Sequence, residues 1–279
     1  FKDRELREKN PHLLIEGIII AGFAVKAQRA YVYIRGEFFR EAERLQAAVE
    51  EAYAAGYLGE SVMGRGVRFD LAVHRGAGAY VCGEETGLIE SLEGKKGQPR
   101  LKPPFPANVG LYGGPTVINN VETLSAIPAI ISNGGEGYSK LGVEKSSGTK
   151  LFSVSGHVNK PGNYEVELGI PLRVLIEEHA GGVRGGWDNL KGVIPGGSST
   201  PVLIKTVCET VTMDYDGLSR AGSMLGSGAV IVMDRSVCIV RAIARLSRFY
   251  RHESCGQCSP CREGTGWLAQ VMERLENGR

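Results

Sequence analysis

Hydrophobic residues follow two alternating patterns along the first half of the chain. They recur at helical spacing over 13–25, whereas 30–36 is rich in β-branched and aromatic residues, so a helix followed by a buried strand is predicted. The order repeats with a helix over 41–55, closed by Gly56, and a strand over 67–73. This alternation is typical of an α/β layer with a largely parallel sheet, which binds ligands beyond the carboxyl ends of its strands.

The pattern changes to short strands and turns from residue 146 onward. Strands are predicted over 149–156 and 164–168, joined by a turn that contains proline and glycine. A helix over 171–179 and a strand over 191–194 follow. The order of hairpin, helix and strand predicts a small β-grasp domain.

The last segment, 235–279, combines helical patterns with a loop rich in cysteine. Cys238 lies in an apolar run, where a free cysteine usually packs as a small hydrophobe. Helical spacing predicts one apolar helix face made of Trp267, Leu268, Val271, Met272 and Leu275, and Gly278 is predicted to mark the end of this helix. We therefore expect an α/β chain with three domains, over 1–145, 146–234 and 235–279.

Three cysteines in the cysteine loop, residues 254–262, carry the strongest chemical signal. Cys255, Cys258 and Cys261 are separated by two residues each, with glycine and proline shaping the turns. This spacing fits three corners of a 4Fe-4S cluster. A structural zinc site, which usually draws on two separate pairs of ligands, and a disulfide are the alternatives. Candidates for a fourth ligand, none at a convincing position, are Cys82, Cys208, Cys238 and His252.

A glycine loop, residues 75–86, follows the strand over 67–73 and leads into a predicted helix over 86–92. This is where an α/β sheet binds a cofactor. The residues that suit a cofactor are Gly76, Gly78 and Gly83 for close backbone approach, Tyr80 for stacking on a flat ring, and Glu84 and Glu85 as hydrogen-bond acceptors. Tight turns and helix-capping glutamates would explain the same residues, so spacing alone leaves both interpretations open.

Two further loops carry candidate residues. The proline-rich loop, residues 99–107, is rigid and can present Phe105 as a fixed platform, although packing beneath the loop is the alternative. Asn119, Asn120 and Thr123 follow in the string N-N-V-E-T. A helix cap is the alternative interpretation of the two asparagines.

Composition narrows the class of protein. The 279 residues suggest two domains or more, and 33 basic against 31 acidic residues give no reason to expect nucleic acid or an anionic membrane surface as a partner. The longest apolar stretch, 13–25, is too short to span a bilayer, and it contains Glu16 and is followed by Lys26. Six cysteines around a thiolate site favour a reducing compartment. Because Phe1 stands where an initiator methionine would, we expect an internal fragment.

Together these stretches resemble the flavoproteins of respiratory NADH:quinone oxidoreductase, complex I, a family of FMN- and NADH-binding subunits. The resemblance covers the whole chain and rests on the strings G-A-G-A-Y-V-C-G-E-E-T, K-P-P-F-P-A, N-N-V-E-T and E-S-C-G-Q-C-S-P-C-R-E-G. It implies a Rossmann-like domain that binds FMN and NADH, a ubiquitin-like β-grasp domain and a helical 4Fe-4S domain. It also implies an FMN site lined by Gly76, Gly78, Tyr80, Gly83, Glu84, Glu85, Asn119, Asn120 and Thr123.

The resemblance implies contacts to NAD(H) from Tyr80, Glu85 and Phe105, with Phe105 stacked on the adenine. The implied activity is hydride transfer from NADH to FMN and one-electron transfer to the cluster, with no side chain as catalytic acid or base. The family's FMN-phosphate loop and fourth cluster cysteine are expected outside these residues.

The implied setting is the peripheral arm of a translocase complex. Its partners would include a thioredoxin-like 2Fe-2S subunit and a large iron–sulfur subunit, at the inner face of the bacterial membrane or on the mitochondrial matrix side. The alternatives are the diaphorase subunit of a soluble NAD-linked hydrogenase or formate dehydrogenase, and a non-catalytic metal-binding module.

Overall fold

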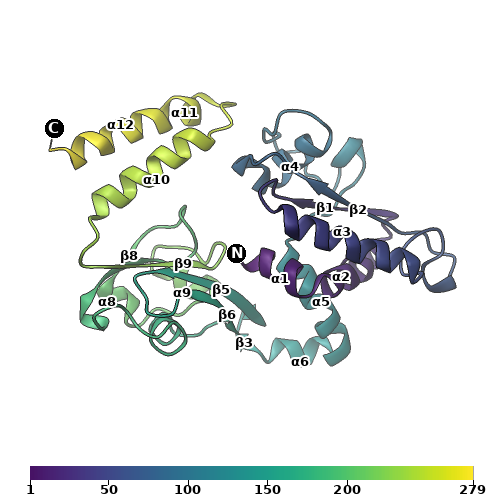
Figure 1. Ribbon diagram of the computed structural model, residues 1–279, viewed down its shortest axis with the longest axis horizontal. Coiled ribbons are helices and arrows are strands. Elements are labelled where there is room, and N and C mark those ends of the chain that lie inside the picture. Colours follow the sequence, from purple (N-terminus) through teal and green to yellow (C-terminus); the bar gives the residue numbers. More distant parts are fainter. Residues whose placement is uncertain (279) are drawn as a thin grey trace. The chain divides into compact units, whose positions relative to one another are not determined.

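The computed structural model describes residues 1–278, which divide into two compact units (Figure 1). The glycine-loop unit combines Asp3–Pro128 with the residues from Ser247 onward. The β-grasp unit comprises Ala129–Leu246 together with the first two residues. The glycine loop and the cysteine loop therefore belong to the same compact unit.

The glycine-loop unit is built around the parallel strands β1 and β2. Its elements are α1 (Lys2–Lys9), α2 (Pro11–Ala24), β1 (Arg29–Ile34), α3 (Phe39–Ala54), β2 (Asp70–Arg75), α4 (Glu85–Leu92), the first part of α5 (Val121–Asn133), the end of α10 (Ile239–Glu253), α11 (Ser259–Arg262) and α12 (Gly264–Glu276). Residues pair from Arg29 opposite Asp70 to Ile34 opposite Arg75. The core of α2, α3 and the strands includes Leu14, Ile18, Leu45, Val49 and Phe69. The predicted α/β layer is confirmed.

Two details of the strands differ from the prediction. Strand β2 begins at Asp70, three residues later than predicted, because Phe69 exchanges backbone hydrogen bonds of 2.8 and 2.9 Å with Gly59 instead of joining the parallel ladder. Strand β1 is half-buried rather than buried, since Val32 is covered while Tyr31 keeps 36% of its surface exposed. The sequence pattern identified both strands but not the local turn that competes for the start of β2.

The β-grasp unit is built on the sheet that contains β5, β6, β8 and β9 (Figure 1). This sheet has five strands, in the order β6-β5-β9-β7-β8. Its elements are α6 (Gly135–Ser139), β3 (Gly142–Val143), β4 (Ser146–Ser147), β5 (Thr149–Gly156), β6 (Gly162–Glu167), α7 (Leu172–Val174), β7 (Leu190–Ile194), β8 (Leu203–Ile204), α8 (Lys205–Cys208), α9 (Tyr215–Arg220) and β9 (Ala229–Asp234). The predicted hairpin is β5–β6, and β5 pairs in parallel with β9. The predicted helix over 171–179 is α7 continued by a π-helical turn over Leu175–His179. The β-grasp prediction is confirmed.

The apolar runs of the C-terminal segment are less buried than the sequence suggests. The prediction for Cys238 is wrong: this residue is exposed, because it lies in the turn between β9 and α10, where Lys191 Nζ holds the neighbouring carbonyl of Val237 at 2.6 Å. The apolar face predicted on α12 is present, but Trp267 and Leu268 keep 66% and 61% of their surface exposed. This face is therefore part of the surface of the described chain.

Helix α2 meets α5 at a position where only glycine fits. A Cβ built on Gly17 would lie 1.9 Å from the carbonyl oxygen of Leu124. Alanine normally stabilises a helix by about 1 kcal/mol relative to glycine, but overpacking against a backbone atom costs roughly 1–3 kcal/mol. We expect Gly17→Ala to lower the free energy of unfolding by about 1 kcal/mol net, as measured by urea denaturation.

Helix α6 offers a control for this prediction. Gly137 is also helical, and the nearest atom to its added Cβ is 3.9 Å away. Gly137→Ala is therefore expected to leave the urea midpoint unchanged or to raise it. A midpoint for Gly17→Ala equal to or above that of the parent chain would contradict the contact between α2 and α5.

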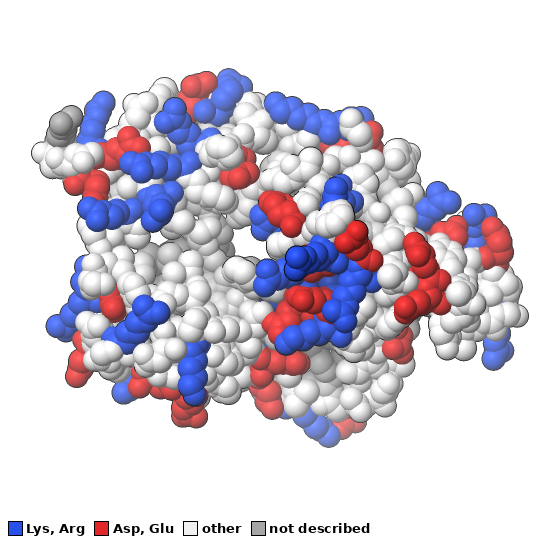
Figure 2. All heavy atoms as spheres, viewed as in Figure 1, with Lys and Arg blue, Asp and Glu red and all other residues white. Residues whose placement is uncertain are grey.

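The surface carries charges of both signs. Figure 2 shows basic and acidic side chains interspersed over the viewed face, in keeping with the 33 basic and 31 acidic residues of the sequence. Among residues 1–278, none of the helices has the length and apolar character needed to cross a bilayer.

Candidate functional site

The glycine loop lies at the carboxyl ends of β1 and β2. A Cβ built on Gly36, after β1, would lie 2.4 Å from the carbonyl oxygen of Gly76, after β2. Gly76 itself packs against Tyr33, whose hydroxyl would be 2.4 Å from an added Cβ. These two glycines allow the loops after the two strands to touch, which is the edge where a sheet of this class binds its ligand.

The other glycines of this loop have different roles. Gly78 has a φ of +88°, a left-handed conformation that disfavours any other residue. A Cβ built on Gly83 meets no described atom within 4 Å. Gly83 therefore presents bare backbone toward open space, as close approach of a flat cofactor would require.

Glu84 caps helix α4. Its Oε2 accepts hydrogen bonds from the backbone N of Thr86 at 2.9 Å and of Gly87 at 2.8 Å. Burial raises the pKa of the Glu84 carboxyl, but hydrogen bonds from Thr86 and Gly87 and the ion pair with Lys102 outweigh it and lower the pKa overall. Because this carboxylate already occupies the first amides of α4, those amides do not bind a phosphate here.

Lys102 fastens the proline-rich loop to the start of α4. Its Nζ lies 3.1 Å from Glu84 Oε1 and also pairs with the carboxylate of Glu85. The hydroxyl of Thr86 accepts a second bond from the same loop, from Arg100 N at 2.9 Å. Phe105, farther along this loop, keeps 54% of its surface exposed. Lys102 could not be identified from the sequence, where its only signal is a single lysine among prolines.

The predicted residues at the start of α5 are anchored differently. Asn120 Oδ1 accepts from Glu122 N at 3.0 Å, and its Nδ2 donates to Asp3 Oδ2 at 3.0 Å. Asn120 therefore caps α5, as the alternative interpretation held, and ties the helix to α1. Asn119 and Thr123 are exposed. The structure thus brings Tyr80, Glu84, Glu85 and Lys102 together in one region. The start of α5 is instead bound to α1, through the hydrogen bond from Asn120 to Asp3.

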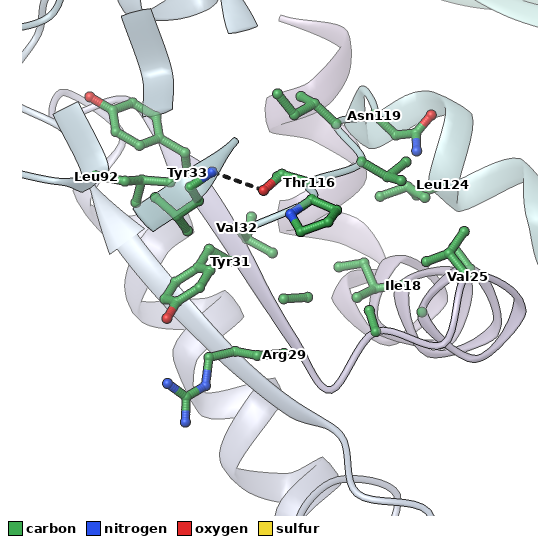
Figure 3. A pocket seen from close by; sticks show the side chains of 18 of the residues that line it. Ile18, Val25, Arg29, Tyr31, Val32, Tyr33, Leu92, Thr116, Asn119 and Leu124 are labelled. Atoms are coloured by element: carbon green, nitrogen blue, oxygen red, sulfur yellow. Dashed lines mark hydrogen bonds between the residues drawn. The ribbon is translucent and has the colours of Figure 1, made fainter. Parts of the chain in front are cut away.

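A cavity of about 900 Å³ flanks strand β1 rather than the glycine loop (Figure 3). Its lining is largely apolar and includes Ile18, Tyr31, Leu92 and Leu124. Asn119 also lines this cavity. None of the predicted glycine-loop residues lines it, so among the predicted FMN residues this cavity takes in Asn119 but leaves out the glycine loop.

The cysteine loop is held by hydrogen bonds within itself. Ser254 Oγ donates to Cys261 Sγ at 3.3 Å, and Arg262 Nη1 donates to the carbonyl of Gly256 at 3.1 Å. Cys255 and Cys261 are half-buried and Cys258 is exposed. Among residues 1–278, His, Cys, Asp and Glu side chains do not gather in threes as they would around a metal ion. The fit to a cluster therefore rests on three thiols within one short loop, a donor set typical of iron–sulfur sites.

The candidates for a fourth ligand can be sorted by position. Burial raises the pKa of the Cys208 thiol to about 12, and this residue lies in the core of the β-grasp unit. A thiol that resists ionisation in an apolar core is a poor cluster ligand. Cys82 is a buried residue of the glycine loop, and Cys238 is exposed. The hydrogen bonds that brace the cysteine loop internally involve none of these three cysteines. His252, by contrast, lies at the end of α10, two residues before the loop, exposed and with its Nδ1 3.4 Å from Glu253 Oε1.

The glycine loop contacts the end of α10, just before the cysteine loop, and Gln98 contacts the cysteine loop itself, all within one compact unit. The backbone N of Tyr80 donates to Glu253 Oε2 at 3.3 Å. Gln98 Nε2 donates to the carbonyl oxygen of Cys255 at 3.0 Å. The ring of Tyr80 meets that of Phe249 edge-on, with 5.2 Å between ring centroids.

An ion-pair cluster includes Arg100 of the proline-rich loop and Glu93 at the end of α4. The Glu93 carboxylate lies 2.7 Å from Lys95 Nζ and 2.8 Å from Arg100 Nη2, and accepts from Tyr112 N at 2.8 Å. Arg100 also pairs with Glu90. This cluster joins the end of α4 to the loops that carry Lys102 and Phe105.

Comparisons with known proteins agree along the whole chain. Residues 1–129 match the family model of the Nuo51 FMN-binding domain, 150–232 that of the SLBB domain, and 241–279 that of the NADH-ubiquinone oxidoreductase-F iron-sulfur binding region.

Curated relatives are similar over nearly all of this chain. It is 60% identical to a subunit of the NADH-quinone oxidoreductase of Rickettsia bellii, over 99% of this chain and 66% of that protein. It is also 60% identical to the mitochondrial NADH dehydrogenase (ubiquinone) flavoprotein 1 of Dictyostelium discoideum, over 99% of this chain and 58% of that protein. The chain thus spans between 58% and 66% of the length of these relatives.

A solved structure has the same fold. A chain of an NAD+-reducing NiFe hydrogenase in the air-oxidised state superposes with a TM-score of 0.88 at 39% identity, covering 100% of this chain and 45% of that chain.

Proposed function

We propose, because this chain belongs to the family of NADH:quinone oxidoreductase flavoproteins, that the protein oxidises NADH and passes the electrons through FMN to a 4Fe-4S cluster. The observation that carries the proposal is a pair of hydrogen bonds within one unit, one from the glycine loop to Glu253, just before the cysteine loop, and one from Gln98 to the cysteine loop. A flavin held at one loop and a cluster held at the other would be neighbours.

FMN, when bound, supplies the conversion between two-electron hydride chemistry and one-electron transfer. We propose that Gly76, Gly78 and Gly83 admit it by close backbone approach. Tyr80 and Phe105 supply flat, exposed faces for stacking. The chain's residues bind and orient, and the chemistry requires no side chain to move a proton.

The remaining site residues keep their proposed roles on chemical grounds. Asn119, Asn120 and Thr123 supply polar contacts to FMN from the start of α5. Glu84 lines the FMN site and, by capping α4, holds the first turn of that helix in place. Cys255, Cys258 and Cys261 hold three corners of the cluster. We also propose the domain division at 145/146 and 234/235.

The partners and location are proposed from the family. They are NADH and the other subunits of the peripheral arm, including a thioredoxin-like 2Fe-2S subunit and a large iron–sulfur subunit. The arm would lie at the inner face of the bacterial membrane or on the mitochondrial matrix side, since relatives are both bacterial and mitochondrial.

One alternative has support of its own. The likeness to the hydrogenase chain favours a diaphorase role in a soluble complex. We prefer the respiratory role, because identity to the quinone oxidoreductase proteins is 60% and to the hydrogenase chain 39%.

Reduction of ferricyanide by NADH tests the proposal in the full-length protein. We expect activity that is lost when FMN is removed and returns when FMN is added back. Equal activity in the flavin-free protein would contradict the proposed path.

Glu85 is proposed to orient the nicotinamide nucleotide. Its side chain is 41% exposed and paired with Lys102, so it can reach a ligand without a large desolvation cost. We expect Glu85→Gln to change the KM for NADH by about threefold to tenfold, the worth of one hydrogen bond, with kcat nearly unchanged. Steady-state kinetics of the full-length protein measure both constants.

Glu50→Gln is the matched control, since Glu50 is exposed on α3. It is expected to alter neither constant. A large loss of kcat at saturating NADH in Glu85→Gln would show that Glu85 acts in the chemical step, contrary to the proposed orienting role.

A further inference from the structure

We propose that Gln98 and Glu253 are positioning residues that hold the cysteine loop against the glycine loop and so set the rate at which an electron reaches the cluster. The proposal rests on the proposed function. Both residues and both loops lie in the same compact unit.

Gln98 fixes the peptide of the first cysteine. Its Nε2 donates to the carbonyl oxygen of Cys255 at 3.0 Å in a partly buried setting. The backbone that carries Gln98 is itself fixed, because a Cβ built on Gly97 would lie 2.7 Å from Cys82 Sγ. Cys82 is buried in the glycine loop. Gln98 therefore connects the glycine loop, through the packing of Gly97 on Cys82, to Cys255, which carries one of the proposed cluster thiols.

Glu253 fixes the chain two residues earlier. Its Oε2 accepts from the backbone N of Tyr80 at 3.3 Å, and its side chain is only 21% exposed. The Tyr80 ring adds an edge-on contact with Phe249, one turn earlier on α10. The two hydrogen bonds thus bracket Ser254, at the entrance to the cysteine loop.

The rest of the cysteine loop is braced internally rather than against the glycine loop. Ser254 bonds to Cys261 and Arg262 to Gly256, so the loop can shift as one piece. Its distance from the flavin side then depends on the contacts of Gln98 and Glu253. Loosening them is expected to slow cluster reduction while leaving flavin reduction by NADH intact, because neither side chain belongs to the proposed flavin or nucleotide site.

Gln98→Met keeps length and removes the donor, and Glu253→Met removes the acceptor. Each is expected to raise hydrogen exchange of the cysteine-loop amides by about fivefold, the worth of one net hydrogen bond, in the full-length FMN- and cluster-loaded protein. Rapid mixing with NADH is expected to show slower growth of the cluster EPR signal at an unchanged rate of flavin bleaching. Glu253→Gln keeps an acceptor and is expected to stay near the parent values.

Gln46→Met is the matched control, because Gln46 is exposed on α3 and bonds to Glu50. Parent-like exchange and cluster reduction in Gln98→Met and Glu253→Met would overturn the proposal, as would a parallel loss of flavin and cluster reduction. If NADH reduced neither group in the parent protein, the proposed function would fail. Hydrogen exchange and the EPR signal of the dithionite-reduced protein would still decide the positioning role.

Discussion

Cys258→Ala is expected to abolish the iron–sulfur signal of the full-length protein while FMN remains bound and reducible by NADH. Cys258 is the middle cysteine of the loop and is exposed, so its thiol serves no packing role. Its loss leaves two of the three thiols that the loop offers, too few to hold a cubane cluster together with one further ligand. Iron content and low-temperature EPR after dithionite reduction measure the cluster. Flavin absorbance measures the bound FMN and its reduction by NADH.

Cys238→Ala provides the matched control. Cys238 is also exposed but lies before α10, outside the cysteine loop. Its replacement is expected to leave iron content and EPR unchanged. A full cluster signal in Cys258→Ala would remove Cys258 from the ligand set, and loss of flavin along with iron would point to a general structural role.

Glu93→Gln is expected to lower the free energy of unfolding at pH 7 by about 2 kcal/mol. A hydrogen bond from Lys95, opposed by burial and assisted by Arg100, lowers the pKa of the Glu93 carboxyl from 4.5 to about 2. The full shift corresponds to about 3 kcal/mol, but Lys95 is largely exposed and solvent screens part of the interaction. Urea denaturation monitored by circular dichroism measures the difference.

The same carboxylate predicts a pH dependence. Because the pKa of Glu93 is lower in the folded chain than in the unfolded chain, its contribution is complete above about pH 5 and is lost as the pH falls from 4.5 toward 2. The stability difference between the parent and Glu93→Gln should therefore shrink over this range. Glu43→Gln, exposed on α3, is the control and should follow the parent at each pH. A constant difference down to pH 3 would contradict the assignment.

Much of the fold could be predicted because its signals are local. Asn10 and Pro11 mark the start of α2, and Asn10 Oδ1 accepts from Leu13 N as a cap should. Pro161 marks the turn between β5 and β6, although Gly162, which was predicted to lie in that turn, already pairs with Val154 as the first residue of β6. The late start of β2 could not be predicted, because it depends on the pairing of Phe69 with Gly59 across a turn.

The site could be predicted only in part. Its glycines and cysteines are marked by spacing, whereas the bond from Gln98 to Cys255 spans 157 residues and leaves no pattern in the sequence. The role of Lys102 likewise leaves no pattern in the sequence, since its pairing with Glu84 and Glu85 exists only once the proline-rich loop folds back onto α4. Cys238 shows the opposite case, where an apolar run suggested burial and a turn exposes the residue.

An anaerobic NADH titration of the full-length protein, with flavin absorbance and low-temperature cluster EPR followed together, decides whether electrons pass from NADH through FMN to the cluster. We expect flavin bleaching accompanied by a new cluster signal, because the two proposed sites adjoin through Tyr80, Gln98 and Glu253. If neither signal changed despite stoichiometric FMN and iron, NADH would not be the donor, and the proposed electron path would be wrong.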